Sequence, residues 1–350
     1  MKVLVTGGAG YIGSVVADEL LQAGHEVVVF DNLSRGHRQA VPKNAELVVG
    51  DLADRAELDQ LLRSRTIDAV MHFAALIEAG ESMKAPETFF RNNTANALTL
   101  VEAMLAAGVK RFVFSSTAAL YGNPERTPIE EDDPLRPTNA YGESKLLVER
   151  MLRWFHQIHG LRYASLRYFN AAGASCPDQG EAHQPETHLI PRILEVALGR
   201  APHVNIFGTD YPTSDGTCVR DYIHVSDLAH AHLLALHALE KALENSPPLT
   251  SKPGTFKPLT LQPLIYNLGN GQGFSVRQVV EVARQVTGHP VPAIESPRRA
   301  GDPAVLIASS EKIRRELGWQ PRFPDLKTIV ESAWQWHRKH PDGYAESLKR

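Results

Sequence analysis

The sequence predicts an α/β protein with a doubly wound parallel sheet and a smaller α/β lobe in its C-terminal half. Three observations support this prediction. In the first half, short apolar runs rich in β-branched residues alternate with segments of helical periodicity. The apolar runs are continuous, which is typical of strands buried on both faces. The second half is less regular and richer in proline and glycine, and a chain of 350 residues is long enough for a second lobe.

Strands and helices alternate in the first half. Six strands are expected, at Lys2–Thr6, Glu26–Asp31, Ala45–Val49, Ala69–Phe73, Arg111–Ser115 and Arg162–Tyr168. The helices between them are expected at Gly13–Ala23, Arg55–Ser64, Glu87–Ala107 and Asn139–His159. Repeated strand–helix–strand order implies a parallel sheet with right-handed crossovers.

The second half is expected to be mostly helical, with one long loop. The helices are expected at His188–Leu198, Val225–Glu244, Val276–Val286, Ser310–Leu317 and Leu326–His340. Residues 245–263 contain five prolines and little periodicity, and they predict a surface loop. The expected domains are residues 1–170, which a segment near 216–270 rejoins, and residues 171–350.

Composition excludes several classes of protein. The net charge of −3, from 37 basic and 40 acidic residues, argues against a nucleic-acid or membrane partner. Two cysteines exclude a disulfide framework and a cysteine-rich zinc site, and no metal site is expected. Prolines interrupt the charge-free stretch Pro258–Val276, so it predicts no membrane helix. With no export signal found, we expect a cytoplasmic protein.

A glycine-rich turn links the first expected strand to the first helix. Gly8, Gly10 and Gly13 satisfy the pattern G-x-G-x-x-G, and Gly7, Gly10 and Gly13 satisfy G-x-x-G-x-x-G, in the strand–turn–helix context that a dinucleotide site requires. Glycines let backbone N–H groups approach a pyrophosphate, and the helix N-terminus adds partial positive charge. The sequence therefore predicts a Rossmann-like dinucleotide site.

The following strand ends supply side chains for the rest of that site. Asp31 ends the second strand, where a carboxylate accepts hydrogen bonds from ribose hydroxyls and repels a 2′-phosphate. NAD is therefore favoured, although the nearby Arg35 keeps NADP open. Further strand ends suited to the cofactor are Asp51-Leu52 and His72-Phe73-Ala74-Ala75.

A tyrosine and a lysine lie four residues apart at the start of an expected helix. Tyr141 and Lys145 therefore share one helical face. A lysine cation beside a phenol lowers the phenol pKa, so that the tyrosine acts as a general acid or base. Upstream, Ser115, Ser116 and Thr117 place hydroxyls at a strand end where one could orient a substrate alcohol.

These motifs together resemble the extended short-chain dehydrogenase/reductase family, and within it the UDP-glucose 4-epimerases. The resemblance covers nearly the whole chain. Its most specific segments are Ile206–Thr213, Gly216–Val225 and Arg298–Asp302, in the part of the family that binds the nucleotide sugar. The implied reaction is NAD-dependent 4-epimerisation of UDP-galactose and UDP-glucose through a 4-keto sugar. The N-acetylhexosamine pair is a further possible substrate.

The resemblance also implies roles for particular residues. Thr117 is the implied catalytic hydroxyl, Tyr141 the acid and base, and Lys145 its activator. The implied NAD contacts are Gly7, Gly10, Tyr11, Ile12, Gly13, Asp31, Asn32, Asp51, Leu52, Phe73, Ala74, Ala75, Asn92, Lys145 and Phe169. The implied UDP-sugar contacts are Thr117, Tyr141, Asn170, His188, Leu189, Asn205, Phe207, Arg220, Tyr222, Arg299, Asp302 and Leu306.

The chain departs from some family members at a few positions. Ile77 stands where some epimerases have a lysine, and Thr187-His188 replaces paired asparagines. Leu306 occupies a position that gates the sugar, and its intermediate size leaves open whether N-acetylated sugars are accepted.

Other reactions of the same family, and a function without catalysis, remain alternatives to this epimerisation. Dehydratases of this family carry an Asp-Glu pair after the catalytic threonine and decarboxylases tend to carry a glutamate, whereas this chain has Ala118 and Ala119. The alternatives left open are a UDP-glucuronate 4-epimerase, a decarboxylase and a regulator that binds NAD and nucleotide sugars without catalysis. The resemblance also implies a homodimer formed by the helices near Glu87–Ala107 and Asn139–His159.

Overall fold

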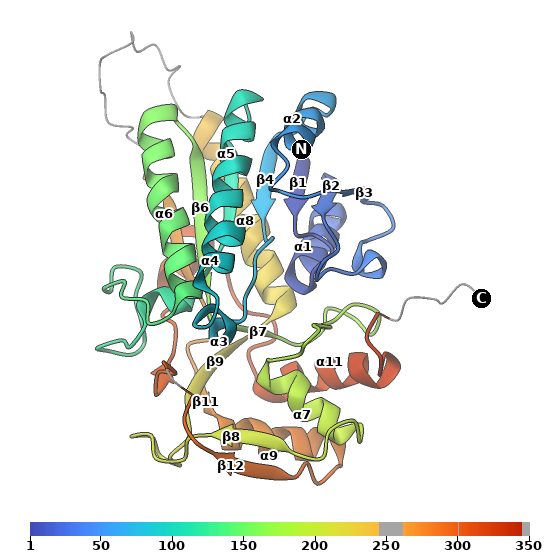
Figure 1. The fold of residues 1–350 in the computed structure, drawn as a ribbon, viewed down its shortest axis with the longest axis vertical. Coiled ribbons are helices and arrows are strands. Elements are labelled where there is room, and N and C mark those ends of the chain that lie inside the picture. The colour runs from blue at the N-terminus through green and yellow to red at the C-terminus, as the bar shows by residue number, and fades with distance from the viewer. Residues whose placement is uncertain (245–261, 300, 345–350) are drawn as a thin grey trace, which may run out of the picture.

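A seven-stranded parallel sheet lies at the centre of the computed structural model, which describes residues 1–244, 262–299 and 301–344 (Figure 1). The spatial order is β10-β6-β5-β4-β1-β2-β3. The bounds are β1 Lys2–Thr6, β2 Glu26–Asp31, β3 Glu46–Val49, β4 Ala69–His72, β5 Arg111–Thr117, β6 Arg162–Tyr168 and β10 Leu264–Leu268. The order reverses between β1 and β4, and ligands bind at such a switch point.

Helices cover both faces of this sheet, as the continuous apolar strands predicted. One face packs against α1 (Tyr11–Gln22) and α8 (Val225–Glu244). The other packs against α2 (Arg55–Ser64), α5 (Asn96–Ala106) and α6 (Ala140–His159). Neighbouring residues on β1 alternate between the two cores, because successive strand side chains point to opposite faces. The doubly wound sheet is therefore confirmed.

The helix expected at Glu87–Ala107 is divided into three parts. After the short α3 (Ala79–Ser82), the chain forms α4 (Pro86–Phe89), the π-helical η2 (Phe90–Ala95) and then α5. The side chain of Asn93 explains the wider turn, because it bonds to both backbone groups of Leu76, each at 2.9 Å. Such π-helical turns are frequent near functional sites.

The second lobe packs small sheets against helices. One sheet contains β7 (Asn170–Ala172), β9 (Val219–His224), β11 (Gly273–Ser275) and β13 (Val305–Leu306). A parallel pair contains β8 (Val204–Phe207) and β12 (Ala293–Ser296). Its core is formed with α7 (Leu189–Ala197), α9 (Val276–Thr287) and α11 (Leu326–Lys339).

The remaining elements are short. They are the 3-10 turns η1 (Arg38–Ala40) and η3 (Ala118–Tyr121), and the helix α10 (Glu311–Leu317). The five helices expected in the second half are present with end shifts of a residue or so, whereas the short strands of this half were not predicted. Most of the loop expected at 245–263 lies outside the described residues. The domain limits stay a prediction. None of the described helices is long and apolar enough to cross a membrane.

Candidate active site

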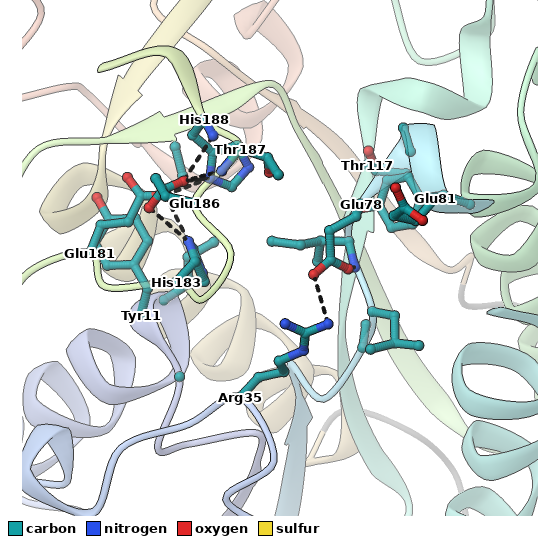
Figure 2. A pocket seen from close by; sticks show the side chains of 18 of the residues that line it. Tyr11, Arg35, Glu78, Glu81, Thr117, Glu181, His183, Glu186, Thr187 and His188 are labelled. Atoms are coloured by element: carbon teal, nitrogen blue, oxygen red, sulfur yellow. Dashed lines mark hydrogen bonds and ion pairs between the residues drawn. The ribbon is translucent and has the colours of Figure 1, made fainter. Parts of the chain in front are cut away.

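A cavity of about 1140 Å³ lies between the carboxyl edge of the large sheet and the second lobe. It is lined by the glycine-rich turn, by the ends of β2, β4, β5 and β6, and by residues of β8, β9 and α7. Figure 2 shows part of it, with Thr117 and Glu78 facing Tyr11 and His188 across the open space. One cavity therefore brings together the dinucleotide motif and the tyrosine–lysine motif.

The glycine-rich turn leaves no room for side chains. Gly7 has φ +74°, and a Cβ there would lie 2.4 Å from the backbone nitrogen of Ala74. A Cβ on Gly13 would lie 2.3 Å from the carbonyl oxygen of Gly7. Gly10 caps α1 without a side-chain bond, so the first N–H groups of the helix donate to no capping side chain. This turn fits the pyrophosphate of a dinucleotide.

The end of β2 fits a ribose. Asp31 accepts hydrogen bonds from the backbone N–H groups of Ala9 at 3.0 Å and Leu33 at 2.8 Å, which fix its carboxylate beside the turn. Burial raises the pKa of Asp31, and the two N–H donors oppose that rise. Arg35 forms an ion pair with Glu78 at 3.3 Å (Figure 2). Arg35, which kept NADP as a possible cofactor in the sequence analysis, is thus paired with a carboxylate.

The catalytic residues implied by resemblance lie together at the end of β5 and the start of α6. Asn139 caps α6 by accepting from the backbone N–H of Gly142 at 2.8 Å, which starts the helix just before Tyr141. The side chain of Thr117 lies near the hydroxyl of Tyr141 and acts to lower its pKa. The ammonium of Lys145 donates to the carbonyl oxygen of Ser115 at 2.9 Å.

The electrostatics of this pair differ from the sequence prediction. Burial raises the pKa of Tyr141, and Thr117 lowers that pKa only in part. Burial also lowers the pKa of Lys145 to about 7. Burial therefore opposes charge on both groups and acts against the lowering of the phenol pKa that the sequence predicts.

Arginines and an aromatic ring line the end of the cavity in the second lobe. Arg299 lies over the ring of Phe207, 4.0 Å from its centroid. Arg220 on β9 lies 3.5 Å from a carboxylate oxygen of Asp302. The side chain of Asn170 donates to the backbone on β9 at 3.0 Å. This end therefore offers two guanidinium groups that could bind phosphate oxygens.

All the residues predicted for the site line the cavity except one. Leu306 on β13 packs instead against a small core that contains Tyr121, Ile129 and Phe169. The structure thus places the expected sugar gate outside the cavity lining, because its side chain packs against that core. The other predicted residues lie in the lining: Gly7, Gly10, Tyr11, Ile12, Gly13, Asp31, Asn32, Asp51, Leu52, Phe73, Ala74, Ala75, Asn92, Thr117, Tyr141, Lys145, Phe169, Asn170, His188, Leu189, Asn205, Phe207, Arg220, Tyr222, Arg299 and Asp302.

Several charged lining residues were missed from the sequence. Glu78 lies after β4 and contributes to the raised pKa of Tyr141. Glu181, His183 and Glu186 gather with His188 in the connection from β7 to α7. The signal for this group was in the sequence, because residues 181–188 contain two glutamates and two histidines.

The fold and the cavity define a Rossmann-type enzyme with a threonine, a tyrosine and a lysine beside its dinucleotide site. A family model described as "NAD dependent epimerase/dehydratase family" matches residues 3–246, and the chain belongs to this family.

Individual relatives agree with that assignment. A UDP-glucose 4-epimerase of Halalkalibacterium halodurans is 51% identical over 100% of this chain and 99% of its own length. A crystal structure of a UDP-glucose 4-epimerase superposes with a TM-score of 0.90 at 48% identity, covering 99% of this chain and 100% of its own. The Bifidobacterium longum enzyme in complex with NAD+ and UDP has a TM-score of 0.88 at 35% identity, covering 98% of this chain and 100% of its own.

Proposed function

We propose that this chain is a UDP-glucose 4-epimerase, an isomerase that interconverts UDP-galactose and UDP-glucose with NAD as its cofactor. The observation that carries the proposal is that the side chains of Tyr141 and Thr117 line the same cavity as the glycine-rich turn and the two arginines. The similarity to curated UDP-glucose 4-epimerases over the full chain supports the same reaction.

In the proposed mechanism, Tyr141 moves a proton at the C4 hydroxyl of the sugar. As phenolate it accepts this proton, directly or through Thr117. It returns the proton to the C4 oxygen after the 4-keto sugar has rotated in the site and presents its other face. When bound, NAD supplies the hydride acceptor and donor and a positive charge beside the phenol. One N–H of the Lys145 ammonium donates to the carbonyl oxygen of Ser115, and the other two are left to stabilise the phenolate.

The arginines have a positioning role in this mechanism. Arg220 and Arg299 would hold the diphosphate while the sugar turns about its link to it. Remote binding energy of this kind keeps a reactive ketone in the site and presents either face of C4.

Elimination and decarboxylation are less well supported. Ala118 is buried and Ala119 follows it in η3, so neither of the two positions after Thr117 offers an acid or a base. Epimerisation needs no second acid, and the set of groups present is sufficient for it.

We also propose a homodimer and a cytoplasmic location. The outer side of α6 supports the dimer, because Trp154 and Ile158 are 61% and 58% exposed there. These residues are four apart, so they form one apolar stripe on the helix. The cytoplasmic location is proposed from the sequence, in which no export signal was found.

The reaction is tested by incubating the purified protein and NAD separately with UDP-galactose, UDP-N-acetylgalactosamine and UDP-glucuronate, and separating the products by chromatography. We expect UDP-glucose from UDP-galactose. Epimerisation confined to UDP-glucuronate, or release of CO2 from it, would assign a sister reaction. Binding of NAD and UDP-sugar with no turnover of any substrate would assign a regulator.

A further inference from the structure

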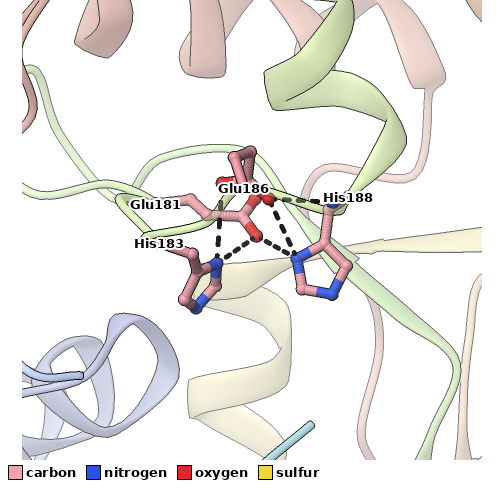
Figure 3. A group of neighbouring side chains, drawn as sticks. All are labelled: Glu181, His183, Glu186 and His188. Carbon is pink, nitrogen blue, oxygen red and sulfur yellow. Dashed lines mark hydrogen bonds and ion pairs between the residues drawn. The ribbon is translucent and has the colours of Figure 1, made fainter. Parts of the chain in front are cut away.

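We propose that Glu181, His183, Glu186 and His188 form a binding site for a divalent transition-metal ion, with zinc preferred. One potential ligand atom of each residue lies within 4.8 Å of the others. All four side chains come from residues 181–188, in the connection between β7 and α7 (Figure 3). This site is separate from the proposed epimerisation, which needs no metal.

The spacing of the four donors suits a tetrahedral ion. Nδ1 of His183 lies 3.1 Å from Glu181 and 3.6 Å from Glu186, and Nδ1 of His188 lies 3.7 Å from Glu186. Ligands of tetrahedral zinc are roughly 3.3–3.6 Å apart, given bond lengths of about 2.0–2.2 Å. The 2.5 Å contact between His188 and Glu181 would have to open, and the 3.1 Å contact between His183 and Glu181 would have to lengthen slightly.

The charges around the cluster also favour a cation. The side chains of Glu181 and Glu186 are only 4% and 6% exposed. Within the described parts of the chain, their ion pairs are all with His183 and His188. Nδ1 of His183 is buried close to both carboxylates without good hydrogen-bond alignment to either. Imidazole and carboxylate together are a usual zinc donor set.

The start of this segment is held by contacts that do not involve the four side chains. Trp336 donates its indole N–H to the carbonyl oxygen of Glu181 at 3.0 Å. Tyr344 accepts from the backbone N–H of Gly180 at 3.1 Å, and His37 bonds to the carbonyl of Ala182 at 2.9 Å. Residues 180–182 are therefore anchored to α11, to Tyr344 and to the segment after β2, while the backbone N–H groups of Thr187 and His188 donate to the carboxylate of Glu186.

The place of the cluster suggests what the ion would do. The cluster lines the cavity beside Tyr11, whose ring lies 6.3 Å from that of His183, and it immediately precedes Leu189 of α7 (Figure 2). The side chain of His188 is 44% exposed, the most open of the four. An ion here would fix the segment that joins the dinucleotide end of the cavity to the nucleotide-sugar end.

The competing explanation is a metal-free network in which both histidines are protonated. The carboxylates raise the pKa of His183 to about 10, so protons and metal compete for the same nitrogens. A metal site predicts ion binding with release of protons, whereas the network predicts neither.

The experiment strips the full-length protein with a chelator, adds zinc chloride, desalts it and measures zinc by mass spectrometry. We expect about one tightly held zinc per chain, as in structural sites. His183→Gln and Glu186→Gln should weaken zinc binding by at least about 10–100-fold, because removing even an outer-shell partner of a ligand typically costs that much. His289→Gln, at an exposed histidine outside the cluster, is the matched control and should bind zinc normally.

Cobalt provides a readout that depends on no variant. Added to the stripped wild-type protein, Co²⁺ should give the visible bands of a tetrahedral site without thiolate charge-transfer bands. Negligible retained zinc, or zinc binding unchanged in both cluster variants, would overturn the proposal and leave the protonated network. A cobalt spectrum of octahedral or thiolate type would overturn this donor set.

Discussion

The hydroxyl of Tyr141 carries the proposed proton transfer, and its removal tests the mechanism at a single atom. Tyr141→Phe keeps the ring and deletes the hydroxyl near Thr117. We expect kcat to fall about 10²–10⁴-fold, the usual contribution of a positioned acid or base. The affinity for UDP, measured by calorimetry, should change little because the arginines remain.

A second phenol provides the control for that variant. Tyr163 on β6 is buried, and it lies outside the cavity lining. Tyr163→Phe should keep its activity under the same purification. Near-normal turnover by Tyr141→Phe would contradict the assignment of the acid and base.

The buried Lys145 predicts a pH dependence of stability. Its pKa is about 7 in the folded chain and 10.5 in its ordinary state. Between these values the unfolded chain binds a proton that the folded chain does not, so the stability contributed at this position rises with pH. Below the folded pKa, Lys145 is protonated in both the folded and the unfolded chain, and the full cost of burying its charge lowers the stability of the folded chain.

Lys145→Met isolates this effect. The free energy of unfolding of the variant, relative to wild type, should be most favourable near about pH 6.5 and decline toward about pH 9.5. Urea denaturation of both proteins across this range measures the difference. A difference independent of pH would show that Lys145 has no shifted pKa in the folded protein.

At the scale of elements, an ion pair fixes α6 to the sheet. Glu149 on α6 accepts from Arg167 on β6 at 2.6 and 3.0 Å, and Ser116 on β5 donates to the same carboxylate at 2.6 Å. Glu149 is one helical turn beyond Lys145, so this contact sets the position of the Tyr141–Lys145 face.

Breaking this ion pair from one side should be costly. Glu149→Leu or Arg167→Met leaves a buried charge without its partner, and we expect a loss of about 3–5 kcal/mol in the free energy of unfolding. The double variant should lose less than the two single losses combined, because neither charge is then left alone. Urea denaturation of all four proteins measures this cycle, and simple additivity would contradict it.

The elements also show which parts of the fold can be read from sequence. The strands of the large sheet were predictable, because burial on both faces makes each a continuous apolar run. The π-helical turn η2 was not, since Asn93 forms its contacts with Leu76, which is distant in sequence. Strands such as β7 are short, and their pairing with β9 depends on residues about 50 positions away.

The candidate site shows the same division. The residues that line the cavity from strand ends and helix starts follow motifs with fixed spacing, as Asp31 and Tyr141 do. Leu306 could not be placed, because only tertiary contacts decide that it packs against the core around Phe169. The sequence shows two histidines and two glutamates within residues 181–188, but only the structure shows that their side chains point toward one another.

At the scale of the whole molecule, the surface of α6 is the feature that a monomer leaves unexplained. Large apolar side chains are seldom well exposed in groups, and such patches mark interaction sites. α5 and α6 run side by side on one face of the sheet (Figure 1), and Trp154 and Ile158 lie on the part of α6 beyond the residues that line the cavity. A second copy that packs the same helices against this face would bury the stripe and leave both cavities open.

Trp154→Glu combined with Ile158→Glu tests this dimer. We expect the wild type to sediment at twice the chain mass of 38.6 kDa and the variant at that mass, because the introduced carboxylates would have to be buried without partners. Ile294→Glu on β12 is the control, since Ile294 is 48% exposed in the other lobe. Monomeric wild type, or a variant that remains dimeric, would contradict the assignment of this face, whatever the epimerase activity of either protein.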